Sequence, residues 1–126
     1  MIDAIFNQPN YVAAKKMLDA SVLRHEAIAS NIGNLEKPNY QRLDLAPSFS
    51  AEFQRACAGG HSAEIAQIQP ALTVDAAAVA ASHDGNTVNL ENEFIQLGQN
   101  FLQHSLETSL ITGSLLKLRL AISGKT

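Results

Sequence analysis

The sequence predicts a mainly α fold: long N- and C-terminal helices pair as a coiled-coil-like hairpin, with an irregular or weakly β insert between them. Apolar residues recur at helical spacing over residues 9–35 and again over residues 87–124. Residues 36–86 show no sustained period of this kind. At 126 residues the chain is long enough for one core and too short for two, so we expect a single unit over residues 1–126.

The first helix is predicted by an apolar stripe that starts at Tyr11 and continues in steps of three and four. A proline at position 9 is compatible with its first turn. Pro38 lacks an amide hydrogen, so the helix must end before it. The stripe residues expected to face the second helix are Leu18, Ile28 and Ile32.

The C-terminal helix has the stronger pattern, because its apolar stripe is interrupted only by His104 and Thr108. Asn89 is suited to cap its start, and Gly124 fits its end. Several leucines lie off the main stripe, so this helix should have more than one neighbour. The stripe residues expected to serve helix pairing and assembly are Leu90, Phe94, Leu97, Phe101, Ile111, Leu115, Leu118 and Ile122.

The insert gives weaker signals. Ile65 to Gln69 has the character of a short strand, and Cys57 to His61 contains two glycines that favour a loop. Asp75 to Ser82 is the low-complexity run DAAAVAAS. We therefore expect an irregular segment with short β or helical pieces.

The exit of the first helix is dense in polar, turn-forming residues and reads ASNIGNLEKPNYQR over residues 29–42. Asn31 and Asn34 are suited to hydrogen-bond the backbone groups left open at a helix end. Asn39 follows a proline and fits a turn position with positive φ, which asparagine tolerates. Tyr40 offers a ring with a polar tip for anchoring the reversed chain.

Composition and motifs argue against several functions. The net charge is −3 and the Lys and Arg residues are scattered, so nucleic acid is an improbable partner. Cys57, His61 and Glu64 have helical spacing, but glycines weaken that helix and no second ligand pair follows, which argues against a metal site. No histidine shares a local catalytic motif with a nucleophile or a carboxylate. We expect no enzyme activity and no cofactor.

The first ten residues, MIDAIFNQPN, show no cleaved secretory signal, because they carry an acid where such a signal carries base. No apolar run approaches the roughly 20 residues that span a bilayer.

The helix exit resembles the N-terminal signature of bacterial flagellar axial proteins. That signature runs alanine, any residue, asparagine, isoleucine, alanine, asparagine, two of any kind, threonine, proline, glycine, tyrosine. The sequence departs from it at Gly33, Lys37 and Asn39, and the last departure keeps a residue that tolerates positive φ. The residues that match, taken as the family turn motif, are Ala29, Asn31, Ile32, Asn34, Pro38 and Tyr40.

A second resemblance narrows the family. The segment DGNTVNLENEFIQLGQN over residues 84–100 is similar to the stretch that leads into the last helix of the FlgB family of proximal rod proteins. SLITGSLLKLRLAISG over residues 109–124 continues this resemblance. The short length agrees, since distal rod and hook proteins carry larger central domains. The chain is therefore identified as a member of the FlgB family.

This resemblance implies a structural subunit of the flagellar basal-body rod, which polymerises through its terminal helices into a periplasm-spanning drive shaft that transmits motor torque. It implies export by the flagellar type III apparatus without a cleaved signal. The implied partners are other copies in the rod, the other rod proteins, the rod adaptor and the membrane-and-supramembrane ring. The alternative from another class is a cytoplasmic coiled-coil adaptor that binds one partner helix and never polymerises.

Overall fold

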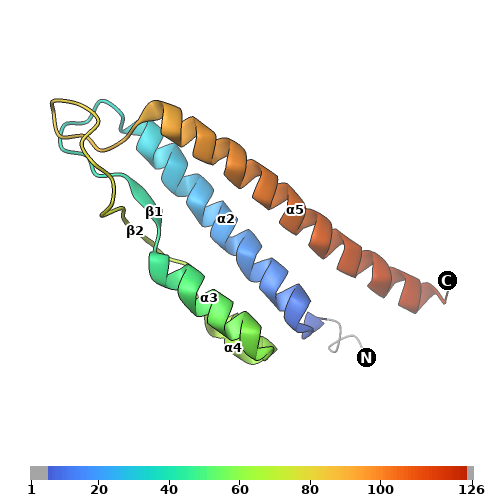
Figure 1. Cartoon of the computed structure of the whole chain (residues 1–126). Coiled ribbons are helices and arrows are strands. Elements are labelled where there is room, and N and C mark those ends of the chain that lie inside the picture. The colour runs from blue at the N-terminus through green and yellow to red at the C-terminus, as the bar shows by residue number, and fades with distance from the viewer. Residues whose placement is uncertain (1–5, 125–126) are drawn as a thin grey trace.

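The computed structural model describes residues 6–124 and confirms a mainly α chain with two long helices and a small two-stranded sheet in the insert (Figure 1). Residues 1–5, the first half of the segment compared with a secretory signal, lie outside the described residues. None of the helices within residues 6–124 has the length and hydropathy needed to cross a membrane. In chain order the elements are α2 (Pro9–Gly33), β1 (Leu43–Leu45), α3 (Pro47–Gly59), α4 (Ser62–Gln67), β2 (Leu72–Val74) and α5 (Leu90–Ser123).

Helix α2 is the centre of the fold. Helix α5 runs antiparallel along one side of it, and α3 and α4 lie on the other side (Figure 1). The connection between α2 and β1 and the long segment between β2 and α5 meet at the same end of the hairpin. Strands β1 and β2 pair antiparallel, with Leu43 opposite Val74. The main contacts of α2 are with α5, β1 and α4, and α3 packs chiefly on α4.

The ends of the two long helices form as their residues dictate. Helix α2 begins with Pro9 in its first turn, and the Asn34 side chain donates to a carbonyl oxygen one turn earlier at 2.8 Å. Helix α5 begins after Asn89, whose side-chain oxygen accepts from the backbone nitrogen of Asn92 at 3.0 Å, so the predicted N-cap is confirmed. Gly124 adopts a left-handed conformation with φ 66° and ends α5.

The strand expected at Ile65 to Gln69 is wrong. Ile65 lies in α4, is almost completely buried, and belongs to an element that packs against α2. A short apolar run does not distinguish a strand from a single helical turn, and burial of Ile65 against a neighbouring helix decides the outcome.

The loop expected at Cys57 to His61 begins later than predicted, because Cys57 and Gly59 still belong to α3. The helix ends at Gly60, which has φ 70° and caps it in the left-handed conformation. Residues 75–82 contain no helix or strand, as their composition indicated.

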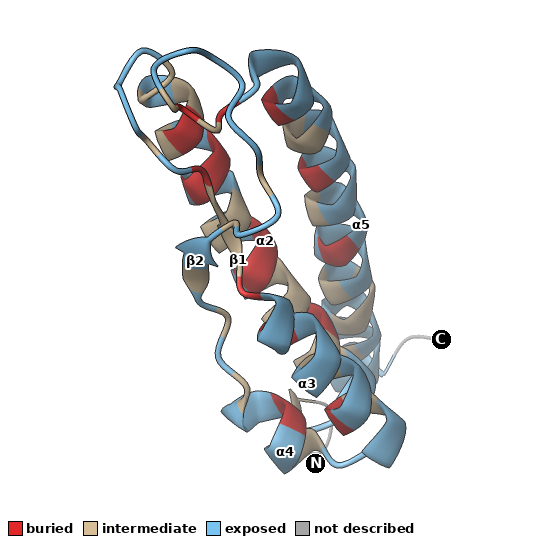
Figure 2. Ribbon diagram, turned by 60° about the vertical axis from the view of Figure 1, so that its left-hand side comes forward, coloured by how far each residue is buried: buried red, intermediate tan, exposed pale blue. Residues whose placement is uncertain are grey.

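The apolar core is thin (Figure 2). None of the described leucines is fully buried, whereas the buried part of α5 consists of polar residues that face α2. The hydrophobic residues that are buried are mostly alanines: Ala14, Ala20, Ala27, Ile28, Ala46, Phe49, Ala56, Ile65 and Val88. Apolar burial therefore supplies less of the stability than in a domain with a leucine-filled core.

Gly85 provides a test of the loop that joins the insert to α5. Its φ is 81°, and a Cβ there would lie 2.5 Å from the side-chain oxygen of Asn39. We expect Gly85→Ala to lower the free energy of unfolding by about 1–2 kcal/mol, because the residue is strained and its neighbour must move. Gly113→Ala is the matched control: it lies inside α5 with nothing within 4 Å and should raise stability by about 0.5–1 kcal/mol. Urea unfolding measures both, and equal midpoints would contradict the strained turn.

Candidate assembly site: a buried polar joint and an uncharged helix face

The turn after α2 has the predicted geometry. Asn39 has φ 58°, the left-handed conformation expected at this position. Tyr40 anchors the reversed chain, because its hydroxyl donates to the side-chain oxygen of Asn31 at 3.3 Å and lies 3.1 Å from the Ser30 hydroxyl. The polar tip of the ring thus ties the turn back to the last part of the helix.

The side chain of Asn31 bonds to β1 instead of to the open backbone groups at the end of α2. Its side-chain nitrogen donates to the carbonyl oxygen of Leu43 at 2.9 Å, and its oxygen accepts from the Leu43 backbone nitrogen at 2.8 Å. The amide thereby pairs with β1 as a neighbouring strand would, which satisfies both backbone groups of Leu43. Asn31 is completely buried and also donates to Glu93 at 3.3 Å, so it connects α2, β1 and α5.

Asn86 joins the turn motif to the start of α5. It is buried, and its oxygen accepts from the backbone nitrogen of Val88 at 2.8 Å. The carbonyl oxygens that accept from its side-chain nitrogen, at 2.8–2.9 Å, belong to Asn34, Leu35 and Lys37. Residues 29–42 and residues 84–100, the two stretches that resemble flagellar proteins, are therefore in direct contact.

Arg42 lies where the turn motif, β1 and the start of α5 meet. Its side chain is 7% exposed, and its Nε donates to Glu93 Oε1 at 2.7 Å, where the Glu93 side chain is 1% exposed. The guanidinium also pairs with Asp44 and Asp75 and donates to Gln96 at 3.1 Å. Burial by itself lowers the pKa of Arg42, but the hydrogen bonds to Glu93 and Asp75 outweigh it and raise the pKa above its usual value. Arg42 therefore keeps its charge in this buried position.

A second arginine completes the network. Arg24 of α2 donates to Asp44 at 3.2 Å and to Gln96 of α5 at 3.1 Å. Burial by itself raises the pKa of Asp75. The hydrogen bonds from Arg42 and from backbone nitrogens have a larger, opposite effect, so the pKa of Asp75 lies below its usual value. We call Arg24, Arg42, Asp44, Asp75 and Glu93 the charged joint. It ties α2, β1, the insert and α5 together at one end of the hairpin. No local sequence pattern indicates it, because its residues come from four separate segments of the chain.

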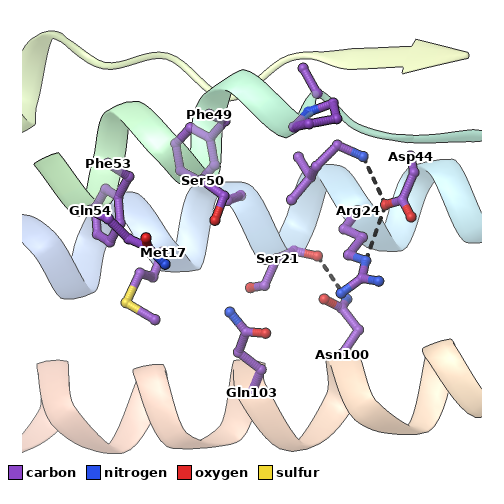
Figure 3. Close-up of a pocket in the computed structure, with 14 residues that line it drawn as sticks. Met17, Ser21, Arg24, Asp44, Phe49, Ser50, Phe53, Gln54, Asn100 and Gln103 are labelled. Carbon is purple, nitrogen blue, oxygen red and sulfur yellow. Dashed lines mark hydrogen bonds and ion pairs between the residues drawn. The ribbon is translucent and has the colours of Figure 1, made fainter. Parts of the chain in front are cut away.

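The contact between α2 and α5 is polar. We call Glu93, Asn100 and Glu107, which recur at intervals of seven, the polar seam; all three are buried. Asn100 Nδ2 donates to the carbonyl oxygen of Ser21 at 2.8 Å (Figure 3). The Ser21 hydroxyl lies 3.4 Å from Nδ1 of His104. These contacts fix the register of the two helices.

Two atoms of the polar seam have no hydrogen-bond partner within residues 6–124: Oδ1 of Asn100 and Oε2 of Glu107. Glu107 is completely buried, and its other oxygen accepts from Gln103 at 3.0 Å. No salt bridge joins Glu107 to a cation in the described part of the chain. Burial of Glu107 in the polar seam therefore lowers the free energy of unfolding instead of raising it.

The apolar stripe predicted to pair with α2 lies beside this seam. Of its members on α5, Leu97, Ile111 and Leu118 are half-buried. Those that remain exposed are Leu90, Phe94, Phe101, Leu115 and Ile122.

On α2, Ile28 is buried and Leu18 and Ile32 are half-buried, whereas Ala29 and Pro38 of the turn motif are exposed. Helical periodicity selects apolar positions, but α2 presents Ser21 at the contact, so polar positions of α5 face it. Within the single chain the apolar stripes are therefore covered only in part, and their role in helix pairing and assembly stays a prediction.

The outward side of α5 carries no charge over a long stretch. From Phe94 to Leu116 the only Asp, Glu, Lys or Arg is Glu107, and its side chain points inward. Much of the α5 ribbon is exposed (Figure 2), and its exposed leucines include Leu102 and Leu106. We call the outward side of residues 94–116 the uncharged face.

The candidate metal ligands do not form a site. Within the described residues no group of three His, Cys, Asp or Glu side chains is arranged to hold a metal ion. Burial raises the pKa of the Cys57 thiol, which makes it a poorer nucleophile.

The charged joint can be tested by removing one arginine at a time. Arg42→Ala leaves the buried Glu93 without its cation, so we expect the free energy of unfolding to fall by about 3–5 kcal/mol. Arg24→Ala removes a more exposed side chain and should cost about 1 kcal/mol or less. Urea unfolding of the purified chains measures the difference, and similar losses for the two variants would show that Arg42 is not the centre of the joint.

Glu107 gives the opposite expectation. Glu107→Leu replaces a buried carboxylate that has no cation by a side chain of similar size, so it should raise the free energy of unfolding by about 1–3 kcal/mol. Ser105→Leu, on the exposed side of the same helix turn, is the control and should change it by about 0.5 kcal/mol or less. A Glu107→Leu chain less stable than the native chain would mean that the seam needs this carboxylate.

Comparison with known proteins agrees with the two sequence resemblances. No family model matches the chain. The flagellar basal body rod protein FlgB of Borrelia hermsii is 27% identical over 115 residues, which cover 77% of this chain and 83% of the relative. FlgB of Escherichia coli K12 is 26% identical over 117 residues, 80% of this chain and 83% of the relative. FlgB of Cereibacter sphaeroides is 30% identical over 110 residues, 81% of this chain and 84% of the relative. The chain belongs to the FlgB family of flagellar basal body rod proteins.

Proposed function

We propose that the chain is a structural subunit of the proximal rod, which polymerises through its terminal helices and passes motor torque along the resulting shaft. The observation that carries this proposal is the uncharged face of α5. It extends over residues 94–116, roughly 35 Å at 1.5 Å per residue. About 25% of the residues in a typical globular domain are charged, so a helix side of this length without any charge is suited to burial.

The apolar side chains of the uncharged face find little cover within the chain. Phe101 is 68% and Leu102 is 70% exposed, and the main contact of α5 is with α2, through the polar seam. Large exposed apolar surfaces mark sites of association, and their burial contributes about 25 cal/mol per Å². Neighbouring subunits in a rod would cover this surface on more than one side.

Transmission of torque requires a subunit that resists relative movement of its helices. The charged joint and Asn86 supply this at one end of the hairpin, where α2, β1 and the start of α5 are bound to one another. Because the Arg42–Glu93 pair is buried, salt screens it less than a surface ion pair. This rigidity supports a mechanical role and no chemical one.

The proposal extends to location and partners. As a member of the FlgB family, the chain would be exported by the flagellar type III apparatus and built into the periplasmic rod. Its neighbours there would be further copies, other rod proteins, the rod adaptor and the membrane-and-supramembrane ring. A non-polymerising adaptor would bury one apolar stripe, whereas α5 exposes leucines on a second face as well.

A charge placed on the uncharged face tests the proposal. Phe101→Asp alters an exposed side chain, so the single chain should keep its fold, but in a rod the new carboxylate would be buried without a partner. In cells that lack the native protein, we expect this variant to abolish motility and the completion of basal bodies. Ala51→Asp places the same charge on the exposed side of α3 and should leave both intact.

Basal bodies isolated from the two strains provide the decisive measurement. Motile Phe101→Asp cells with complete rods would show that this surface is not used in assembly. Native chain found in the cytoplasm but absent from purified basal bodies would favour the adaptor.

A further inference from the structure

An apolar groove runs between α2 and α5 on one side of the hairpin and has a volume of about 820 Å³. Phe94, Leu97 and Phe101 of α5 form one wall, and Val22 and His25 of α2 form the other. Phe101 and Val22 are both exposed, at 68% and 44%. The groove lies immediately beside the polar seam, so the apolar side chains that the seam excludes from the helix contact gather here.

A ridge of leucines lies on another face of the same helix. Leu102, Leu106 and Leu110 are spaced four residues apart and are all more than half exposed. Residues at this spacing form the ridge that packs into the groove of a neighbouring helix. At 100° per residue, Leu106 points roughly 140° away from Phe101 around the axis of α5, so the ridge cannot reach the groove of its own chain.

We propose that the ridge of one copy occupies the groove of the next copy. This inference rests on the proposed function, that the chain polymerises, and names the contact that repeats. Because groove and ridge are different surfaces of one chain, the contact is head-to-tail, and every copy that receives a ridge still offers its own. Such contacts generate rings or helical polymers, whereas a contact between two identical patches would stop at a dimer.

Charge favours a second copy as the occupant of the groove. Glu26 is the one charged residue that lines the groove, and the ridge lies within the uncharged face. The contact therefore buries almost no charge. The exposed polar residues beside the ridge, which include Gln99, Ser105 and Ser109, are neutral, so the ridge brings no negative charge to Glu26. The chain also supplies one ridge for each groove, as a repeating contact requires.

Disulfide cross-linking in assembled basal bodies tests the contact. The full chain carries Cys57→Ser, Val22→Cys in the groove and Leu106→Cys on the ridge, and replaces the native protein in cells. Both sites are exposed, so neither change should disturb the subunit. After mild oxidation of isolated basal bodies, we expect a ladder of multiples of this chain on a non-reducing gel. Each single-cysteine chain should remain a monomer there, because the head-to-tail contact never brings two equivalent sites together.

Three results would overturn the proposed contact. They are basal bodies that contain the chain but give no ladder, single-cysteine chains that dimerise, and a Leu106→Cys chain that links to a protein of different mass. In all three the chain remains a rod subunit, so the proposed function survives. If the Cys57→Ser chain without added cysteines is absent from basal bodies that are otherwise complete, the proposed function itself fails.

A charge pair gives a second measurement that does not depend on cysteine chemistry. Val22→Glu and Leu106→Lys each place one charge in the contact, so each alone should reduce incorporation into basal bodies at least tenfold. The chain with both changes should recover incorporation, because every contact then holds one Glu and one Lys. Failure of the double variant to exceed the single variants would overturn the contact.

Discussion

The fold depends on one buried ion pair, Arg42 with Glu93. An isolated charge at either position would be costly to bury, so the two side chains must be placed together, and this requires β1, α2 and the start of α5 to meet. Asn31 contributes by holding β1 on α2 and by donating to Glu93. The thin alanine core is spread along α2, α3 and α4, while the geometry of the hairpin end is set by hydrogen bonds and charge.

Local chemistry made much of the fold predictable from the sequence. Proline and asparagine specify helix ends through the backbone groups of neighbouring residues, which is why the cap at Asn89 and the positive φ of Asn39 were foreseen. The charged joint was not, because Arg42, Asp75 and Glu93 are far apart in the chain and each looks like an ordinary surface residue. Ile65 was misassigned for a related reason: only its burial against α2 distinguishes a helical turn from a strand.

The pairing of the long helices shows where periodicity misleads. A stripe of apolar residues indicates a surface that will be buried, but it does not say which surface covers it. Here Glu93, Asn100 and Glu107 are the fully buried residues of α5, whereas the apolar stripe is at most half-buried and its member Phe101 is exposed. For a subunit that is buried among its neighbours, the polar side of a helix can mark the inside of the single chain. Membership in a family of rod proteins fits this inverted arrangement.

The polar seam also has a thermal consequence. Separating α5 from α2 would hydrate Asn100, Glu107 and the Ser21 backbone, while exposed apolar side chains of α5 such as Phe101 and Leu102 are in water already. Hydration of apolar surface raises the heat capacity on unfolding and hydration of polar surface lowers it, so a step that hydrates mainly polar groups adds less to the heat-capacity change than opening an apolar contact of the same area. The free energy of separating the two helices is therefore expected to curve less with temperature than that of an apolar helix pair with the same contact area.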